Sequence, residues 1–316
     1  MRAAWYDRQG DAADVLTVGD VDRPEPGAGE VRVRITYSGI NAGDVKKRRG
    51  WLGSAMPYPR VIPHSDGAGV INAAGPGADP ARIGRRVWVY GAQSYRPFGT
   101  AAAATVVPEA LAVELPPNVN NHVGAALGIP GITAHRAVFA DGPVRGTFVL
   151  VHGVRGAVGS LAAQLARWGG ALVIGTVRSG TGGVPLDGPD PAADILRLAP
   201  GGVDRVIDVA FGANIELNAA VATPGCVIAA YASAEERPPI PYWPLAFSNV
   251  TIRLLGSDDF PAEAKQAAAR DLTRAAAEGA LHIEVAEPYP LDRIADAHRA
   301  VEAGSRHGRV LLKVPG

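Results

Sequence analysis

The most regular pattern of apolar and polar residues lies near the middle of the chain and predicts a strand, a helix and a second strand. The run Thr147–Val151 is uncharged and rich in β-branched residues, which is typical of a strand buried on both faces. Leu161, Leu165 and Trp168 then repeat at helical spacing. A second apolar run, Ala171–Thr176, predicts another buried strand, so the segment has the order of a strand–turn–helix–strand unit.

Three glycines stand between the first of these strands and the helix, with the spacing G-x-x-G-x-x-G. Val154 stands where the usual G-x-G-x-x-G fingerprint has its second glycine. A glycine-rich turn lets backbone N–H groups approach a pyrophosphate, and the helix N-terminus adds a favourable dipole. A glycine turn without a ligand is the common alternative, but a position between a strand and a helix is the context that a dinucleotide site needs. The predicted dinucleotide turn comprises Gly153, Val154, Arg155, Gly156, Ala157, Val158 and Gly159.

The end of the second strand indicates which dinucleotide binds. An NAD site usually has Asp or Glu about 20 residues beyond the glycines, where it binds the ribose 2′-hydroxyl. No acidic residue occurs from Ser160 through Leu186, and Thr176, Arg178 and Ser179 follow the strand instead. A guanidinium and hydroxyl groups suit a 2′-phosphate, so we predict NADPH. The alternative is that the arginine is an ordinary surface residue.

The segment that follows is unusual for a doubly wound fold, in which a helix should come next. Residues 180–191 contain four glycines and three prolines. Each glycine costs a helix about 1 kcal/mol and an interior proline about 3 kcal/mol. The next predicted helix starts after an N-cap at Asp190 and ends near Leu198. We expect that one helix is missing, which would leave a more open adenine pocket, put the phosphate mainly on Arg178 and Ser179, and give modest cofactor affinity or room for a bulkier ligand.

The first third of the chain has the pattern of an irregular β domain. Glu30–Thr36 alternates strictly between apolar and polar residues. Further strands are predicted around Val70–Ile71, within Gly84–Tyr90 and at Thr105–Pro108, separated by glycine and proline. A basic run, Lys46–Arg49, is typical of a solvated helix face.

Composition limits the classes of function. The 316 residues, of which 47% are apolar and 20% charged, suffice for two domains with a large core. Lysine plus arginine equals aspartate plus glutamate at 31 each, which gives no electrostatic reason to expect nucleic acid or an anionic membrane as partner. The single cysteine, Cys226, excludes an intramolecular disulfide. Neither a signal peptide nor an apolar run near 18 residues is present, so we expect a soluble, cytoplasmic protein that acts on a small molecule.

The motifs, taken in order, resemble those of the zinc-free medium-chain dehydrogenases/reductases, and most closely the NADPH:quinone oxidoreductases related to zeta-crystallin. The resemblance implies an α/β fold with a GroES-like β domain at residues 1–122 and a Rossmann, doubly wound parallel-sheet cofactor domain at 123–257. Residues 258–316 would return to the first domain. The segments that carry the resemblance are the glycine-rich unit and residues 39–50, 61–71, 98–116 and 127–138.

The sequence predicts no metal site. Zinc-dependent relatives carry a cysteine ligand in the first domain and a Gly-His-Glu near the position of Pro63–Asp66. In this chain His64 stands at the glycine position and Ser65 at the ligand position, and the one cysteine lies in the cofactor domain. An imidazole and a carboxylate without a thiolate make a poor zinc site.

The resemblance assigns roles to residues near the nicotinamide. Asn41 and Asp44 match an Asn-x-x-Asp motif, and Thr133 matches the threonine that holds the carboxamide. A turn asparagine and a helix N-cap are the structural alternatives. The catalytic candidates are Asn41, Asp44 and Tyr231, whose hydroxyl either donates to the substrate or packs. The strand ends expected beside the nicotinamide supply Val209, Ala210, Ala230, Tyr231 and Ala232.

The substrate itself is not determined by the sequence. Aromatic candidates for substrate contact are Trp51, Tyr58, Tyr95 and Tyr242, although isolated aromatic residues more often belong to a core. Three functions stay open: an NADPH-dependent reductase of quinones or enones, a biosynthetic alkene reductase that saturates or cyclises a larger metabolite, and a catalytically silent NADPH-binding protein. The apolar strand at 249–256 predicts a homodimer, because in similar reductases this strand pairs with its symmetry mate.

Overall fold

The computed structural model of the protein describes residues 1–304 and 308–315. The chain divides into two compact units, Met1–Pro130 with His282–Gly316 and Gly131–Leu281. Each unit is described below by itself, and the chain passes between them within helix α3 (Asn121–Phe139) and after Leu281.

These units differ from the expected ranges at both ends. Residues 123–130 belong to the first unit, and residues 258–281 belong to the second. Helix α8 (Ala262–Ala277) accounts for the second difference, because it packs on the C-terminal half of α3. His135 Nε2 lies 2.8 Å from Asp271 Oδ2, and a Cβ on Gly131 would lie 2.9 Å from a methyl carbon of Leu272.

The first unit is built on a sheet with the order β14-β15-β3-β4-β5-β7, in which β6 also pairs with β3. Strand β3 is central because one of its edges is shared by two partners. Its first half pairs with β6 and its last three residues pair with β15, while β4 runs along the other edge. The strands are β1 (Arg2–Trp5), β2 (Thr17–Asp20), β3 (Glu30–Gly39), β4 (Asp66–Ala74), β5 (Arg86–Val89), β6 (Ala104–Pro108), β7 (Ala112–Glu114), β14 (Tyr289–Pro290) and β15 (Leu311–Lys313).

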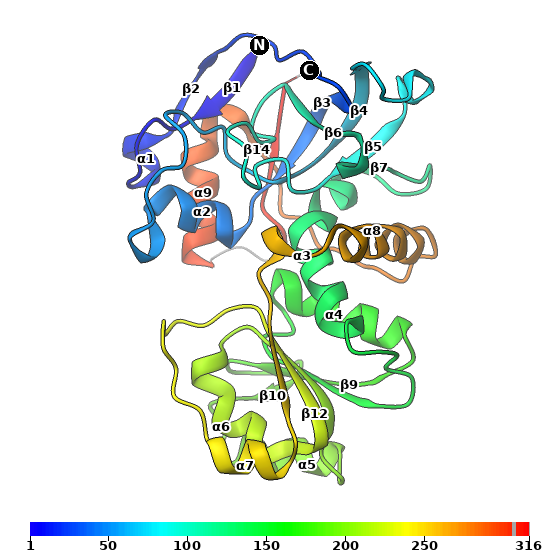
Figure 1. The fold of residues 1–316 in the computed structure, drawn as a ribbon. Helices are drawn as coiled ribbons and strands as arrows, with labels where there is room; N and C mark the ends of the chain where they lie inside the picture. The colour runs from blue at the N-terminus through cyan, green and yellow to red at the C-terminus, as the bar shows by residue number, and fades with distance from the viewer. Residues whose placement is uncertain (305–307, 316) are drawn as a thin grey trace. The chain divides into compact units, whose positions relative to one another are not determined.

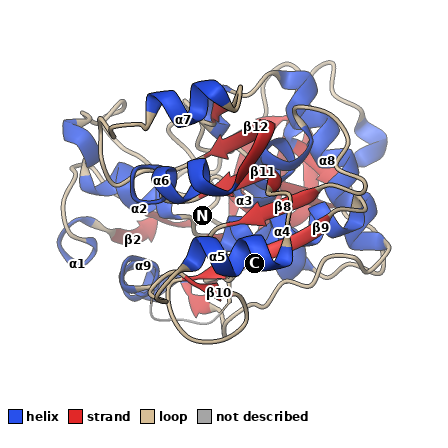
Figure 2. Cartoon of the chain, turned by 90° about the horizontal axis from the view of Figure 1, so that it is seen from below, coloured by secondary structure: helices blue, strands red, loops and turns tan. Residues whose placement is uncertain are grey.

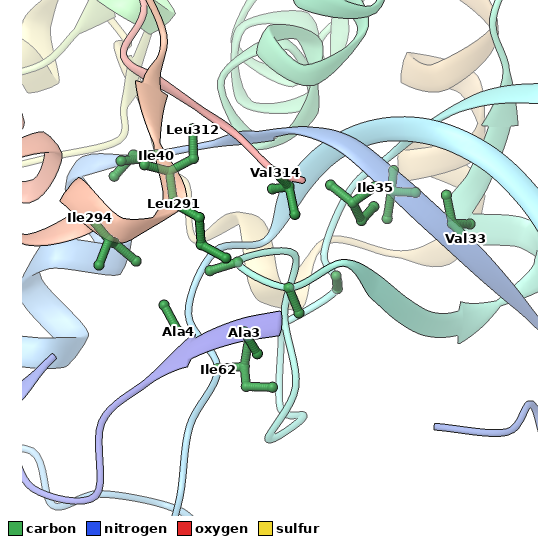
Figure 3. Packing of buried hydrophobic residues seen from close by; sticks show 14 of the residues in the cluster. Ala3, Ala4, Val33, Ile35, Ile40, Ile62, Leu291, Ile294, Leu312 and Val314 are labelled. Atoms are coloured by element: carbon green, nitrogen blue, oxygen red, sulfur yellow. The ribbon is translucent and has the colours of Figure 1, made fainter. Parts of the chain in front are cut away.

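The alternating pattern of β3 explains its place in the core. Val33 and Ile35 are at most 1% exposed and point toward apolar residues from the two ends of the chain. Figure 3 shows them with Ala3 and Ala4 of β1 and with residues of the C-terminal segment such as Leu312. The return of the chain therefore completes the core of the first unit, because burial of these side chains needs both segments.

Among the helices of the first unit, α2 differs in part from what the sequence predicts. The helices are α1 (Ala12–Val15), α2 (Ala42–Arg49), α9 (Ile294–Ala303) and the short helices η1 (Trp51–Gly53), η2 (Pro80–Arg82), η3 (Glu109–Leu111) and η5 (Leu291–Arg293). The basic run in α2 is only partly a solvated face, since Arg48 has no solvent exposure whereas Arg49 is exposed. Helix α9 lies beside α2 (Figure 1) and supplies Glu302, which forms an ion pair with the Arg48 guanidinium.

The second unit contains a parallel sheet with the order β10-β9-β8-β11-β12-β13. Numbered from β8, this is the 3-2-1-4-5-6 order of a doubly wound dinucleotide-binding fold. Figure 2 shows β9, β8, β11 and β12 side by side, with helices on both faces of the sheet. The strands are β8 (Phe148–Val151), β9 (Leu172–Val177), β10 (Val184–Pro185), β11 (Val203–Asp208), β12 (Ala222–Ala230) and β13 (Thr251–Leu254). The helices are α4 (Ala157–Trp168), α5 (Pro191–Leu198), α6 (Phe211–Val221), α7 (Tyr242–Phe247), α8 and the short η4 (Ser257–Asp259).

The connection between β9 and β10 is short. Residues 178–190, all of which the structure describes, contain no helix, and six residues join the two parallel strands. Parallel strands usually need a crossover of a dozen or more residues. Gly180 and Gly182 adopt φ values of 81° and 89°, which other residues rarely adopt, so the tight path depends on glycine.

Helix α5 begins where the sequence predicts it. Pro191 is its first residue, and the Asp190 carboxylate accepts a hydrogen bond of 3.0 Å from the backbone N–H of Ala193. Among the helices of the described residues, none is long and apolar enough to cross a membrane.

Strand β13 forms one edge of the parallel sheet, which leads to the first prediction. Leu254 in this strand is 73% exposed, and an exposed strand edge favours pairing with a second copy. We expect light scattering to give twice the 32.6 kDa mass of the chain. Leu254→Lys should give a monomer, because a charged edge opposes pairing, whereas Leu172→Lys, at a 52% exposed leucine of β9, should not. A monomer mass for the parent protein would contradict the prediction.

Candidate functional site

The glycine-rich turn connects β8 to α4 and is closely packed. Gly153 has a φ of 64°, and Gly156 is the N-cap of α4. A Cβ on Gly159 would lie 2.3 Å from the carbonyl oxygen of Gly153, so only glycine allows the helix to approach the turn this closely. Ala157 and Val158 form the first turn of the helix. The turn and the helix N-terminus thus fit the pyrophosphate of a dinucleotide.

Val154, which departs from the usual fingerprint, fits because β9 has a glycine beside it. The side chain of Val154 packs over Gly175, where a Cβ would lie 2.9 Å from Val154 Cγ1. The backbone N–H of Val154 donates a 3.1 Å hydrogen bond to the carbonyl of Thr176. These two contacts hold the turn against the end of β9.

Below the turn lies a buried network that sequence reasoning missed. His152 has no solvent exposure, and its Nε2 lies 2.8 Å from Asn218 Oδ1. Asn218 Nδ2 donates to Asp208 Oδ2 at 2.6 Å, so Asn218 Oδ1 accepts and His152 carries its proton on Nε2. His152 Nδ1 therefore accepts from the hydroxyl of Thr176 at 2.9 Å. Burial lowers the pKa of His152, which keeps the ring neutral in this role.

This network changes the expected 2′-phosphate site. Thr176 was expected to contribute its hydroxyl, but the side chain is fully buried and the hydroxyl is bonded to His152. Arg178 and Ser179 are exposed and remain candidates. The Thr176 hydroxyl thus serves the buried histidine at the end of β8, which requires a partner on β9.

Asp208 also fixes the ends of the two strands expected beside the nicotinamide. Its Oδ1 accepts hydrogen bonds from the Ala210 N–H at 2.7 Å and from Asn214 Nδ2 at 2.8 Å. Its backbone carbonyl accepts from the Tyr231 N–H at 3.0 Å, and the Ala232 carbonyl accepts from the N–H of the first residue of α6, also at 3.0 Å. Asp208 therefore holds two of the predicted residues, Ala210 and Tyr231, where they follow β11 and β12.

The side chains at these strand ends differ in exposure. Val209 is 38% exposed, whereas Ala230 is 4% exposed. Burial and the nearby Asp208 carboxylate raise the pKa of Tyr231. The phenol thus stays protonated at neutral pH and can donate a hydrogen bond.

In the first unit, Asn41 is the centre of a buried cluster. The Asn41 backbone N–H donates to Asp44 Oδ2 at 2.7 Å, at the start of α2. Asn41 Nδ2 donates to Asp66 Oδ2 at 2.7 Å, and Asn41 Oδ1 accepts from the Arg309 guanidinium at 2.7 Å. All four residues are at most 9% exposed. One of the two amide N–H groups of Asn41 is therefore bonded to Asp66.

Asp66 has both an unusual pKa and a structural role. Burial, together with the neighbouring Asp44 carboxylate, raises its pKa to about 7, against the opposing effects of Asn41 and Arg309. Its carboxylate accepts from the Ile129 N–H at 2.9 Å, at the kink of α3. A Cβ on Gly128 would lie 2.0 Å from Asp66 Oδ1. The carboxylate therefore caps the second half of α3, which the family motif at this position did not reveal.

A chain of buried hydrogen bonds runs from Asp66 to α9. The Thr100 hydroxyl donates to the Asp66 carbonyl at 2.6 Å, so Ser38 must donate to Thr100, at 2.7 Å, and accept from His64 Nδ1, at 2.8 Å. His64 Nε2 then accepts from His298 Nε2 at 2.9 Å. This order assigns one proton to each neutral ring.

This chain of hydrogen bonds ends at the guanidinium of Arg48. Arg48 Nε donates to His298 Nδ1 at 3.3 Å, and the guanidinium also donates to the Gly10 carbonyl. Burial lowers the pKa of His298 to about 3, and burial next to His298 lowers the pKa of His64. The two histidines thus join α9 to the core of the first unit as neutral rings.

The donor set around His64 does not suit zinc. Both ring nitrogens of His64 are bonded to protein partners, and Ser65 is 3% exposed. Within residues 1–304 and 308–315, no three His, Cys, Asp or Glu side chains are grouped so that they could hold a metal ion. The φ of 77° at His64 agrees with its place at the glycine position of zinc-dependent relatives.

The remaining predicted residues are distributed over both units. Thr133 lies inside α3 and is 5% exposed, so it is not a helix N-cap. In the first unit, Lys46 Nζ lies 4.3 Å above the ring of Trp51, and the Tyr58 hydroxyl donates to the Tyr95 carbonyl at 2.5 Å. Tyr242 belongs to α7 of the second unit and is 63% exposed. A hydrogen bond therefore joins two of these aromatic residues, Tyr58 and Tyr95.

Comparison with known proteins identifies the family. Residues 27–117 match the alcohol dehydrogenase GroES-like domain, and residues 187–312 match the zinc-binding dehydrogenase family. Mouse quinone oxidoreductase is 38% identical over 168 residues, which are 52% of this chain and 48% of that protein. The chain thus spans about half the length of this relative, while the 29% identity to human quinone oxidoreductase extends over 93% of this chain and 92% of the human protein.

Solved structures agree with this assignment. A mycobacterial quinone oxidoreductase has a TM-score of 0.84 at 28% identity and covers 99% of both chains. A mycobacterial protein complexed with NADPH has a TM-score of 0.83 at 26% identity, also over 99% of both chains. An NAD-dependent alcohol dehydrogenase has a TM-score of 0.87 at 27% identity over the full length of both. These matches support a quinone oxidoreductase-like family of medium-chain dehydrogenases/reductases, and the predicted α/β fold of a GroES-like domain and a Rossmann domain is confirmed.

The buried titratable groups of the first unit predict opposite effects of pH on stability. The pKa of His298 is lowered on folding, so its contribution is present above about pH 6.5 and is lost as the pH falls toward 3. The pKa of Asp66 is raised, so its contribution is present below about pH 4 and is lost as the pH rises to 7. We expect His298→Gln to flatten the rise of the unfolding free energy between pH 4 and 6 by up to about 1.4 kcal/mol per pH unit, and Asp66→Asn to steepen it. Denaturant unfolding at several pH values measures both slopes.

Equal slopes for the parent, His298→Gln and Asp66→Asn would show that neither group changes its pKa on folding.

Proposed function

We propose that the protein is a zinc-independent oxidoreductase that uses NADPH to reduce a quinone or an α,β-unsaturated carbonyl compound. The observation that carries the proposal is the glycine turn at the carboxyl end of β8, which is held by the His152–Asp208 network and left open to an anion at the start of α4. Relatives named quinone oxidoreductases support the choice of substrate class.

The cofactor would bind along the carboxyl ends of the strands of the second unit. The turn Gly153–Gly159 would hold the pyrophosphate, and Arg178 with Ser179 would hold the 2′-phosphate. The strand ends at 209–210 and 230–232, together with Thr133, would border the nicotinamide. When bound, NADPH supplies the hydride.

The protein would contribute hydrogen-bond donors to the substrate. Hydride addition to the β-carbon of an enone places negative charge on its oxygen, and preorganised donors stabilise that charge. Each unit, taken by itself, offers one proposed donor: the second N–H of the Asn41 amide in the first unit and the protonated phenol of Tyr231 in the second. Asp44 positions Asn41 through its backbone N–H, which makes it a positioning residue.

Oxidation of NADPH in the presence of a panel of quinones and enones tests the activity. Turnover is expected with at least one of these compounds. NADPH binding without any turnover would instead favour a catalytically silent NADPH-binding protein, and turnover restricted to larger alkenes would favour a biosynthetic reductase.

Cofactor preference provides a prediction about Arg178. NADPH should bind more tightly than NADH, and Arg178→Ala should weaken NADPH binding by roughly ten- to a hundredfold, because it removes a charge-assisted hydrogen bond to the phosphate. Titration calorimetry with both cofactors measures the effect. Arg167→Ala, at an exposed arginine in the last turn of α4, is the control and should change neither affinity. Equal affinities of the parent protein for NADPH and NADH would exclude the proposed phosphate site.

Metal independence provides a further prediction. Activity and thermal stability should survive exhaustive chelation, because both nitrogens of His64 are engaged by protein partners and Ser65 offers no thiolate. Elemental analysis before and after chelation is the measurement. Stoichiometric zinc that leaves together with the activity would refute metal independence.

A further inference from the structure

The short connection after β9 lies directly against the glycine turn, and one side chain of the turn covers it. The guanidinium of Arg155 donates to the carbonyl of Thr181 in this loop. It also packs over Gly182, where a Cβ would lie 2.8 Å from an Arg155 terminal nitrogen. A Cβ on Gly183 would lie 2.6 Å from the Gly175 carbonyl oxygen, so the loop is confined between β9 and Arg155.

The surroundings of Arg155 leave its charge available to an anion. Among the residues that the structure describes, neither Arg155 nor Arg178 is in an ion pair with a carboxylate. Both side chains are exposed, and no acidic residue occurs from Ser160 through Leu186. The acceptor that Arg155 has is a neutral backbone carbonyl, and a phosphate accepts more strongly from a guanidinium.

We infer that Arg155, in the glycine turn, is a specificity-determining residue that forms, with Arg178 at the end of β9, a two-arginine site for the 2′-phosphate of NADPH. The inference rests on the proposed function and deepens it. A crossover helix after β9 would move the chain away from the strand edge, whereas the six-residue connection keeps Thr181 and Gly182 in contact with Arg155 of the turn. The loss of the helix is therefore what allows a turn side chain to take part in cofactor selection.

The inference separates Arg155 from the rest of the glycine turn. The backbone of the turn serves the pyrophosphate, which NADPH and NADH share. A guanidinium that serves the 2′-phosphate should affect NADPH alone. The ratio of the two dissociation constants is therefore the decisive quantity, and it does not depend on turnover.

The experiment compares the parent protein with Arg155→Met, which keeps the length of the stem and removes the charge, and Arg155→Lys, which keeps the charge and removes the planar fork. Dissociation constants are measured by calorimetry for NADPH, NADH, adenosine 2′,5′-bisphosphate and 5′-AMP. Arg155→Met should weaken NADPH and the bisphosphate by roughly ten- to a hundredfold and leave NADH and 5′-AMP within about twofold, and Arg155→Lys should fall between. Arg167→Ala is again the control.

Two outcomes would overturn the inference alone, and a third would refute the proposed function on which it rests. Equal weakening of NADPH and NADH by Arg155→Met would show that Arg155 serves the pyrophosphate or the fold of the loop. Unchanged NADPH affinity would show that Arg155 does not contact the cofactor. A parent protein that binds neither NADPH nor NADH would refute the proposed function itself, whereas tight binding of both with no effect of either Arg155 variant would refute this inference alone. If Arg155→Met lowers the melting temperature, Arg155→Lys with parental stability still decides between these outcomes.

Discussion

Two fully buried aspartates determine where the candidate residues of each unit lie, because a buried carboxylate must be surrounded by donors. In the second unit, Asp208 accepts from Ala210, Asn214 and Asn218, and Asn218 in turn orients His152. In the first unit, Asp66 accepts from Asn41 and Ile129. Each carboxylate belongs to the terminal residue of a strand and joins segments that are separate in the sequence.

The two carboxylates do this in different ways. Asp208 holds two strand ends of one parallel sheet, so it fixes the surface against which a dinucleotide would bind. Asp66 has a second carboxylate nearby and only the amide of Asn41 between itself and Arg309, and burial in that setting raises its pKa to about 7. Asp66 is one hydrogen bond away from Asn41, the side chain proposed as donor. Because the pKa of Asp66 is close to neutrality, its protonation state would affect the hydrogen bonds of Asn41.

The sequence was most informative where structure is determined locally. The glycine turn, the capped start of α5 and the alternation of β3 all depend on residues within one or two turns of each other. The sequence was least informative about buried polar contacts over long separations. Asn41 and Arg309 are 268 positions apart, and His64 and His298 are 234 apart.

The same limit applies to Arg48 and Thr176. The basic neighbours of Arg48 in α2 predict that its side chain is exposed to solvent. It is buried instead, and its ion-pair partner is 254 residues away in α9. The place of Thr176 at the end of a strand predicts a phosphate ligand, and its hydroxyl donates a hydrogen bond to the buried His152, which follows another strand. No pattern within either segment contains the partner, so the burial of these side chains could be found only in the fold.

The connection between β9 and β10 contains no helix, and this local departure changes what lies beside the glycine turn. A helix after β9 would add its own surface beside the adenosine, whereas the six residues that replace it have three glycines and little surface of their own. Fixing such a flexible segment costs conformational entropy, about 1–2 kcal/mol per residue. The contacts that offset this cost are the pairing of β10 with β9, the burial of Val184 to 8% exposure, and the hydrogen bond from Arg155 to Thr181. If Arg155 binds the 2′-phosphate as inferred, the phosphate would compete with the loop for the Arg155 guanidinium, and the order of this loop and the binding of the cofactor would be coupled through one side chain.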